Sequence, residues 1–549
     1  MLADFNRTSA LDSLAPNLRE MRRVPLNPDH LDAIRAIGVA RSFNTGDMVM
    51  KPGDLMVDFM LVEEGEVAIV NAATGERVQP FGLGPGQFTG EISFLQGGRN
   101  ALAMAAMVPT TVVVVPRIAM LDLMSRVPEL SDIVITVFTA RRRRQIEEGD
   151  TDLRLVGSAD DKALNRIASF ASRNKFAFAR LDADEPQARA LAIKGDVPQG
   201  APFVVFGEEH FLLDPKPVDV ARHLGVGLSV VDAEVLDVLI IGGGPAGVAA
   251  AVYAGAEGLS ALVLEDLAVG GQAGASSRIE NYMGFPTGIS GADLVWRGEV
   301  QALKFGTRFA VPVRVACLEK QQDGLFCATT ESGETLCART VIVATGVLYR
   351  QLPLQRMEHF EGAGIFYAAT DLEARFCKGS EAVIIGGGNS AGQAAMHLSR
   401  HAAHVHVVVR GASLAASMSD YLAKRLAAGP NITVHYQSEV TELHGDLALD
   451  AITLRESEQT RTIRTKAVFV MAGAAPNTVW LGGFLKLDRN GFILTGQEAG
   501  SANALETSVK GVFAVGDVRA GSTKRVASAV GEGSVVIAKA WEHVRGNGD

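Results

Sequence analysis

The sequence predicts a multidomain chain in which an α+β part is followed by two nested α/β domains. Three observations predict this fold class. With 549 residues the chain is too long for one hydrophobic core, and its length favours three to four domains. Closely spaced glycine turns separate short apolar runs between about Leu26 and Arg144, as in a small β-barrel or jelly roll. Farther on, the strands Val238–Ile241 and Val383–Ile385 each end in a glycine-rich turn that opens an Ala-rich helix.

Charge and cysteine content restrict the partners and the compartment. A net charge of −10 gives no electrostatic reason to expect a nucleic-acid partner, and we interpret the one basic run, Arg141–Arg144, as a solvated helix end. The four cysteines form no C-x-x-C pair and no ligand cluster, which argues against zinc, iron–sulfur clusters and a disulfide framework. Because free thiols fit a reducing compartment, we expect a cytoplasmic protein.

Membrane and metal binding are not expected. The first 30 residues carry several charges and no apolar centre, so they do not resemble a signal peptide. The most apolar run, 238–256, contains the first glycine turn, and a buried strand plus helix explains it better than a membrane span. His401, His404 and His406 lie close in sequence but have no neighbouring carboxylate or cysteine partner, so we predict no metal site there.

The first domain is predicted to cover residues 1–146. A helix at Pro28–Ile37 precedes the strands of the barrel, and helices follow it from Pro116 to Arg144. An acidic linker then leads to a small unit at residues 152–226. Strands and helices are expected there in the order Leu153–Val156, Asp161–Arg173, Phe176–Leu181, Glu185–Ala192, Pro202–Phe206, His210–Leu213 and Val218–Leu224.

The first glycine turn has G-x-G-x-x-G spacing. Gly242 permits a tight turn, Gly244 lets the backbone approach a pyrophosphate, and Gly247 lets the helix pack on the strand. The helix N-terminus supplies N–H groups and a favourable dipole. Glu265, at the end of the next strand, is placed to bind an adenosine ribose hydroxyl. The segment therefore predicts dinucleotide binding.

A second glycine turn carries Gly386 and Gly388, and Gly516-Asp517 follows another apolar strand near the end of the chain. We infer one domain, 234–349 with 476–549, that is interrupted by another at 350–475. Two nucleotide-binding units nested in this way imply that one dinucleotide hands electrons to the other.

The barrel resembles the cyclic nucleotide-binding domain family in its glycine turns and in the stretch from Gly90 to Arg99. The resemblance implies that Gly90, Glu91 and Ile92 open a phosphate-binding cassette, that Glu91 binds a ribose hydroxyl and that Arg99 pairs with the cyclic phosphate of cyclic AMP or cyclic GMP. Asn100 stands where the family has a small residue, and the Glu91–Arg99 spacing departs slightly from the common forms. A nucleotide site and a degenerate structural barrel both remain open.

The unit at 152–226 resembles the thioredoxin and glutaredoxin fold in the order of its elements. Pro202, at the start of the third strand, stands where that family has a cis proline, so a cis bond is predicted there. The unit contains no cysteine, which excludes disulfide exchange and favours a docking or spacer module.

From Val235 to its end the chain resembles the low-molecular-weight thioredoxin reductases. The resemblance implies FAD and NADPH as cofactors, with NADH as the open alternative. It places Glu265 at the adenosine ribose, Asp517 at a ribityl hydroxyl and the helix near Arg525 at the flavin O2 side. The implied FAD residues are Gly242, Gly244, Pro245, Ala246, Gly247, Glu265, Gly271, Gln272, Asn281, Ala344, Thr345, Gly346, Gly516, Asp517, Arg525, Val526 and Ala527. Those implied for the nicotinamide nucleotide are Gly386, Gly388, Asn389, Ser390, Ala391 and Arg410.

Two departures from that family bear on function. Its Cys-Ala-Thr-Cys disulfide motif is matched here by residues 368–371, where Ala368 and Asp371 replace both sulfurs, so thioredoxin reduction through this motif is excluded. Cys377 is the nearest thiol, and we interpret it as core packing. Of the arginines that read the NADPH 2′-phosphate in the family, only Arg410 is retained, with Ser413, Ser417 and Ser419 nearby.

The sequence thus predicts a homodimeric FAD-dependent NAD(P)H oxidoreductase of thioredoxin reductase type without the redox disulfide. Hydride is expected to pass from nicotinamide C4 to flavin N5, and the electrons to leave for oxygen, a quinone, a carrier protein such as ferredoxin, or a small thiol. The alternative is a sensor in which a cyclic nucleotide and the flavin redox state control a partner protein with little turnover.

Overall fold

The computed structural model describes residues 26–546 apart from 72–73, 101, 149–150, 152, 159–160, 199, 208–209, 228–234, 277–278, 350–351, 362, 368, 370, 416, 458 and 472. The chain divides into two compact units. One comprises Met1–Ser158, Asn174–Leu228 and Val300–Phe309. The other comprises Ala159–Arg173, Ser229–Glu299 and Ala310–Asp549.

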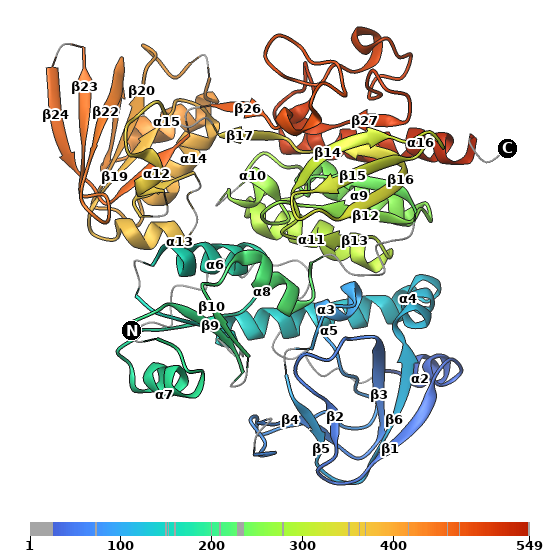
Figure 1. Ribbon diagram of the computed structural model, residues 1–549. Helices are drawn as coiled ribbons and strands as arrows, with labels where there is room; N and C mark the ends of the chain where they lie inside the picture. Colours follow the sequence, from blue (N-terminus) through green and yellow to red (C-terminus); the bar gives the residue numbers. More distant parts are fainter. Residues whose placement is uncertain are drawn as a thin grey trace. The chain divides into compact units, whose positions relative to one another are not determined.

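The N-terminal barrel consists of two three-stranded antiparallel sheets (Figure 1). One has the order β1-β6-β3, with β1 Val39–Phe43, β6 Thr110–Pro116 and β3 Asp58–Glu64. The other has the order β2-β5-β4, with β2 Met48–Met50, β5 Met104–Ala106 and β4 Val67–Ile69. Four consecutive valines, Val112–Val115, make β6 a favourable central strand because branched side chains pack well on a pleated surface.

Helices α2 (Pro28–Arg35), α3 (Ile92–Gln96), α4 (Arg117–Arg126) and α5 (Pro128–Glu148) belong to the barrel domain. Helix α3 begins where the Glu91 carboxylate accepts the Ser93 N–H at 3.0 Å. Phe138 of α5 packs edge-on against Phe88 and Phe94, with ring centroids 6.0 and 5.8 Å apart. These contacts fix α5 on the barrel.

A four-stranded sheet follows, with the order β10-β9-β7-β8. Strands β7 and β8 are parallel, whereas β9 pairs antiparallel with both β7 and β10. The predicted succession of elements is confirmed, with small shifts at their ends. It runs β7 Leu153–Val156, α6 Lys162–Arg173, β8 Ala179–Leu181, α7 Pro186–Lys194, β9 Phe203–Phe206, β10 His210–Leu213 and α8 Pro217–Leu224.

The predicted cis bond before Pro202 is wrong. Within the described part of the chain the cis peptide bond is Val311–Pro312, so Ala201–Pro202 is trans. The Ala201 N–H donates to the Pro198 carbonyl at 3.0 Å. This turn brings the chain into β9 without a cis bond.

From Leu236 on, the chain forms a seven-stranded sheet with the order β13-β12-β11-β16-β15-β14, in which β27 also pairs with β16. Its strands are β11 Leu236–Ile241, β12 Ala261–Leu264, β13 Arg308–Ala310, β14 Val315–Lys320, β15 Phe326–Thr330, β16 Thr335–Val343 and β27 Val512–Ala514. The helical segments in this part of the chain are α9 Pro245–Ala256, α10 Gly271–Gly274, α11 Gly291–Lys304, η4 Val479–Leu481, η5 Gly496–Ala499, η6 Gly516–Val518 and α16 Val526–Gly546.

One sequence expectation is corrected in this sheet. Cys327 of β15 lies directly opposite Cys337 of β16, and the two sulfurs form a disulfide. The spacing of ten residues matches no metal or redox motif, so only the strand register brings the two cysteines together. The other two cysteines, Cys317 and Cys377, are free thiols.

The nested domain has a five-stranded parallel sheet in the order β18-β25-β19-β20-β21 and an antiparallel sheet β22-β23-β24. Ile384 of β19 belongs to the core cluster that includes α14, and its neighbours Val383 and Ile385 belong to the cluster that includes β22 and β23. Burial on both faces explains why this strand is apolar throughout.

The strands of this domain are β18 Ile365–Phe366, β19 Glu381–Ile385, β20 His404–Val409, β21 Ile432–Tyr436, β22 Ser438–His444, β23 Ala451–Glu456, β24 Gln459–Arg464 and β25 Ala467–Val470. Its helical segments are α12 Met357–Phe360, α13 Asp371–Ala374, η3 Arg375–Cys377, α14 Asn389–Leu398 and α15 Asp420–Ala428. A two-stranded pair, β17 Val347–Tyr349 and β26 Ala474–Pro476, lies where the chain enters and leaves the domain. Among the described helices, none has the length and apolar composition needed to cross a membrane.

Candidate functional site

The first glycine turn forms a cradle between β11 and α9. At Gly242, where φ is +108°, a side-chain carbon would overlap the Ala344 carbonyl oxygen. At Gly247 it would overlap the Gly242 carbonyl oxygen. Gly244 differs from both, because no atom lies within 4 Å of the position a side-chain carbon would take. The turn therefore leaves open space beside Gly244 at the N-terminus of α9, where N–H groups favour an anion.

Glu265 lies buried beside this cradle, immediately after β12. Its Oε2 accepts the Gly243 N–H at 2.7 Å, and its Oε1 accepts the N–H groups of Leu267 and Ala268 at 3.1 and 3.2 Å. Burial and the neighbouring Asp266 raise the pKa of Glu265 to about 7, against the N–H donors, which lower it. The acid thus holds the glycine turn and the chain after β12 together.

The C-terminal motif is brought to the same cradle. A side-chain carbon at Gly516 would lie 3.0 Å from the Ala246 Cβ of α9. Burial, followed by the charge of Glu532, raises the pKa of Asp517, and Lys524 lowers it. Glu532 of α16 accepts the Gly516 N–H at 2.7 Å and pairs with Arg519 at 2.5 Å.

Sequence reasoning missed Glu532 and Arg519. Both act on the turn that presents Asp517, and no motif marks them. Glu532 lies seven residues after Arg525, two helical turns into α16, and this spacing could have indicated that it faces back toward the turn.

The other predicted FAD residues occupy several elements. Gly271 and Gln272 begin α10, and the Gln272 side-chain amide donates to the Val347 carbonyl at the start of β17. The Thr345 hydroxyl donates to the Asn477 carbonyl at 2.8 Å, and Gly346 follows with φ +59°. Asn281, Arg525 and Ala527 are exposed and Val526 is partly exposed, the last three at the start of α16.

The second glycine turn forms a similar cradle between β19 and α14. A side-chain carbon at Gly386, where φ is +147°, would overlap the Met471 carbonyl, whereas at Gly388 its nearest neighbour would be 3.8 Å away. Asn389 and Ser390 are exposed at the start of α14, and Ala391 is buried beneath them. This space suits a second nucleotide.

Two of the predicted phosphate-binding serines are engaged with that turn. The Ser417 hydroxyl donates to the Gly387 carbonyl at 2.7 Å, and Ser419 donates from its N–H and its hydroxyl to Asn389 Oδ1 at 2.7 and 3.0 Å. Arg410 is exposed one residue beyond the end of β20.

The two positions that match the redox cysteines are only partly described by the structure. Ala368 lies outside the described residues, and Asp371 begins α13 with its side chain outside them. The interpretation of Cys377 as core packing is confirmed. Its side chain is fully buried in an apolar cluster, and burial together with Glu373 raises the pKa of the thiol to about 12.

The histidines lie on neighbouring strands of the nested domain. The His406 Nδ1 lies 3.0 Å from the His435 Nε2, and burial lowers the pKa of His406 to about 4. His404 bonds the Thr433 hydroxyl, and the His401 ring lies against that of His397. No group of three or more metal-ligating side chains is arranged to hold an ion in the described part of the chain.

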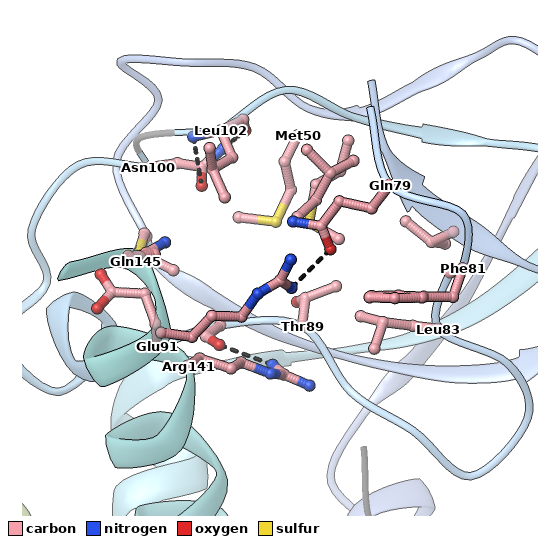
Figure 2. A pocket seen from close by; sticks show the side chains of 17 residues that line it. Met50, Gln79, Phe81, Leu83, Thr89, Glu91, Asn100, Leu102, Arg141 and Gln145 are labelled. Carbon is pink, nitrogen blue, oxygen red and sulfur yellow. Dashed lines mark hydrogen bonds between the residues drawn. The ribbon is translucent and has the colours of Figure 1, made fainter. Parts of the chain in front are cut away.

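The barrel encloses a pocket of about 850 Å³, its solvent-open part included (Figure 2). Of the predicted cassette residues, Gly90, Glu91 and Asn100 line it, and Ile92 is buried at the start of α3. Arg99 is not part of the lining. The lining residues are Met50, Met56, Val67, Ile69, Gln79, Phe81, Gly82, Leu83, Thr89, Gly90, Glu91, Asn100, Leu102, Met104, Arg141, Arg144 and Gln145.

The interpretation of Arg141–Arg144 as a solvated helix end is wrong. Arg141 donates to the carbonyls of Gly90 and Phe88 at 2.7 and 2.8 Å. Arg142, only 7% exposed, pairs with Glu91 at 2.6 Å. These guanidinium groups hold α5 on the cassette, because each finds an acceptor in the barrel that the local sequence does not reveal.

Comparison with known proteins agrees with this architecture. The pyridine nucleotide-disulphide oxidoreductase family matches residues 236–533, more than half of the chain, and the cyclic nucleotide-binding domain matches residues 40–127. The NADPH-dependent thioredoxin reductase 3 of Arabidopsis thaliana is 34% identical over 57% of this chain and 59% of its own length. The thioredoxin reductase of Streptomyces clavuligerus is 34% identical over 55% of this chain and 91% of its own.

Among solved structures, Lactococcus lactis thioredoxin reductase in its FR conformation aligns with a TM-score of 0.52 and 27% identity, covering 56% of this chain and 99% of that one. The match to the pyridine nucleotide-disulphide oxidoreductase family starts at the strand before the first glycine turn and includes both cradles and the Gly516-Asp517 motif. The chain therefore belongs to the pyridine nucleotide-disulphide oxidoreductase family, as an FAD-dependent oxidoreductase of thioredoxin reductase type with a cyclic nucleotide-binding domain in its N-terminal part.

Proposed function

We propose that this chain passes electrons from NAD(P)H through FAD to an acceptor other than the thioredoxin disulfide. The observation that carries the proposal is the pair of open glycine cradles at Gly244 and Gly388, in a chain where Ala368 and Asp371 replace the redox cysteines. Two nucleotide sites without a disulfide between them suit direct transfer from the flavin to an acceptor.

The residues of the first cradle fit FAD. Gly244 and the N–H groups of α9 would hold the pyrophosphate, and Glu265 would face the adenosine ribose. Asp517, presented by a turn that Glu532 and Arg519 brace, would bind the ribityl chain. When bound, FAD supplies the two-electron redox chemistry of the site.

The residues of the second cradle fit a nicotinamide nucleotide, at Gly388 and the start of α14. Arg410 is exposed at the end of β20, where its guanidinium can pair with a 2′-phosphate. We therefore propose NADPH as the preferred donor, with NADH as the alternative.

The acceptor is proposed by class. Oxygen, a quinone, a one-electron carrier protein and a small thiol all take electrons without a cysteine pair on this chain. The buried Cys377, with its raised pKa, supplies no thiolate at neutral pH.

We also propose that the protein is a cytoplasmic homodimer. We assign the barrel a regulatory role because Arg142 joins its cassette to Lys175 and Phe176.

A second candidate function is a sensor, in which barrel ligand and flavin redox state control a partner protein. The ligand pocket and the Arg142 contacts favour it. Anaerobic reduction of the protein by NADPH separates the two functions. Rapid loss of the oxidised flavin absorbance, followed by steady turnover with one of the acceptor classes, supports the enzyme. Slow reduction with every acceptor supports the sensor.

Loss of Asp517 should weaken FAD binding. Asp517→Ala removes a charge-assisted hydrogen bond worth about 1.5 to 3 kcal/mol, or roughly ten- to a hundredfold in Kd. Equilibrium dialysis with FAD gives the constant. The matched control is Asp323→Ala, an exposed acid in the turn between β14 and β15, which should bind FAD like the wild type. Unchanged FAD affinity in Asp517→Ala would contradict the site.

Thioredoxin should not be reduced by the purified protein with NADPH, because no cysteine pair stands at positions 368 and 371. The measurement is the rate of disulfide reduction in wild type and Cys377→Ala. Both proteins should give only the background rate while NADPH oxidation by other acceptors continues. Turnover of thioredoxin that disappears in Cys377→Ala would refute the assignment of Cys377 to the core.

A further inference from the structure

The last residue of β21 is an exposed tyrosine. Ile432 and Val434 precede it at intervals of two residues and pack against the core cluster that includes α14 and α15. Successive side chains of a strand alternate between its two faces, so Tyr436 continues the row that these two residues begin. Tyr436 is 44% exposed, so the row starts in the core and ends in solvent.

This row lies on the face of the sheet that carries the second glycine cradle. Strands β20 and β21 are parallel, and Tyr436 stands directly opposite Val409, the last residue of β20. Val409 belongs to the same core cluster, so the two residues share a face. A side-chain carbon at Gly387, in the middle of the second glycine turn, would lie 3.0 Å from the Val409 Cγ1. Tyr436 therefore stands on the cradle's side of the sheet, at the carboxyl ends of the strands.

Arg410 is adjacent to the strand partner of Tyr436. It follows the last residue of β20 and is exposed. The Gln437 N–H donates to the Gly411 carbonyl at 3.1 Å, which ties the chain after one strand to the chain after the other. Neither the Arg410 nor the Tyr436 side chain makes a hydrogen bond, an ion pair or a ring contact with another described residue. Both groups are thus available to a ligand at this edge of the sheet.

The two groups suit the two distinctive parts of an adenosine 2′-phosphate. In open α/β sheets, ligands bind outside the carboxyl ends of the strands, and β20 and β21 follow β19, the strand of the cradle, in the sheet. An adenine ring offers a π face on which an aromatic side chain can stack. A phosphate suits the planar fork of a guanidinium.

From this arrangement we propose that Tyr436 binds the adenine ring of the nicotinamide nucleotide by stacking, while Arg410 pairs with the 2′-phosphate of NADPH. The inference rests on the proposed function, because it needs a nicotinamide nucleotide at the second cradle. Since NADPH and NADH both carry adenine, Tyr436 contributes equally to the binding of each. Arg410 alone then separates the two.

Calorimetric titration of the full-length, FAD-loaded protein tests this division. The probes are NADP⁺, NAD⁺ and nicotinamide mononucleotide, which has no adenosine. The variants are Tyr436→Leu, Tyr436→Phe and Arg410→Met. The matched control is Tyr253→Leu, because Tyr253 is 46% exposed but lies on α9, beside the first cradle's sheet. Thermal unfolding of each variant separates loss of binding from loss of fold.

Tyr436→Leu should weaken NADP⁺ and NAD⁺ by the same factor, about tenfold, which is the scale of one base–aromatic stack, and leave nicotinamide mononucleotide unchanged. Tyr436→Phe should match wild type, because the ring is kept. Arg410→Met should weaken NADP⁺ alone, and Tyr253→Leu should match wild type. In NADPH oxidation, Tyr436→Leu should raise KM and leave kcat unchanged, as expected when an interaction common to the ground state and the transition state is removed.

Unchanged NADP⁺ affinity in Tyr436→Leu overturns the inference, and so does an equal loss in Tyr253→Leu. A loss in Tyr436→Phe as large as that in Tyr436→Leu overturns the stacking role, because the hydroxyl would then be the binding group. In each of these cases NADP⁺ still binds wild type, so the proposed function stands. Failure of wild type to bind either NADP⁺ or NAD⁺ contradicts the proposed function, and the inference with it.

Discussion

The surroundings of Glu265 act on its charge in two opposite directions. Three backbone N–H groups donate to its carboxylate, which favours the ionised form. Burial and Asp266 favour the protonated form more strongly and raise the pKa to about 7. In the unfolded chain the pKa returns to its ordinary value near 4.5, so between these values the folded state binds more protons than the unfolded state.

The free energy of unfolding should therefore fall as the pH rises from about 5 to about 7 and then level off, by roughly 2 to 4 kcal/mol for a shift of this size. Glu265→Gln removes the titration and should flatten this part of the profile. Chemical unfolding of flavin-free wild type and variant across this pH range is the measurement. Parallel profiles of the two proteins would show that Glu265 does not titrate between these values.

At the scale of single residues, some features could be predicted from the sequence and others could not. Gly242, Gly247 and Gly386 could be identified because their backbone geometry excludes a side chain. The partners of Arg141–Arg144 could not, since charged runs are normally solvated and their acceptors lie about 50 residues earlier in the chain. The Cys327–Cys337 disulfide depends on strand register in the same way.

At the scale of elements, the packing of α9 against α16 depends on one glycine. A side-chain carbon at Gly533 would overlap the Ala246 carbonyl oxygen of α9 and lie 2.9 Å from the Ala249 Cβ. Figure 1 shows the two helices beside the same sheet. The first turn of α9 is also part of the cradle that we propose for FAD, so separation of the two helices would disturb stability and, on that proposal, cofactor binding.

Gly533→Ala should accordingly cost about 1 to 3 kcal/mol or more, the range for overpacking, and reduce FAD retention. The same change at Gly531 is the matched control, because no atom lies within 4 Å of the added carbon. There alanine should stabilise the helix by roughly 0.5 to 1 kcal/mol. Thermal unfolding and bound FAD are measured for both. Equal effects at the two positions would refute the close contact.

The ends of helices and strands could be predicted where turn-forming residues follow an apolar run directly. The strands Leu153–Val156 and His210–Leu213 were placed to the residue, and α8 began one residue earlier than expected. The conformation before Pro202 was not predictable, because the turn from Pro198 to Ala201 decides how the chain enters β9. The pairing of β27 with β16 was implied only by the nested order of motifs.

At the largest scale, Arg142 joins parts of the first unit that are separate in sequence. It pairs with Glu91, donates to the Ser93 hydroxyl at 2.7 Å and to the Lys175 carbonyl at 3.2 Å, and lies over the Phe176 ring. One side chain of α5 thus contacts both the cassette and the chain before β8.

Arg142→Met would leave the Glu91 carboxylate buried without its partner, which costs about 3 to 5 kcal/mol. Chemical unfolding should show this loss, and the double variant Glu91→Gln with Arg142→Met should recover part of it. Arg126→Met is the control. Its pair with Asp122 is 61% exposed on both sides, so the change should stay within about 1 kcal/mol. A similar small effect in Arg142→Met would mean that solvent already screens the Glu91 pair.

The pairing of β27 with β16 and the packing of α16 on α9 also bear on how the chain folds during its synthesis, because both use segments that are translated last. The cradle at Gly244 is translated before the nested domain, but Gly516, Asp517 and Gly533 emerge from the ribosome only after it. Until β27 has been synthesised, the segment Val341–Val343 of β16 lacks its β27 partner. FAD, as the ligand of the finished sheet, then stabilises a product that the nascent chain reaches last, so a shortage of flavin should leave full-length chains with folded N-terminal domains and an incomplete second unit.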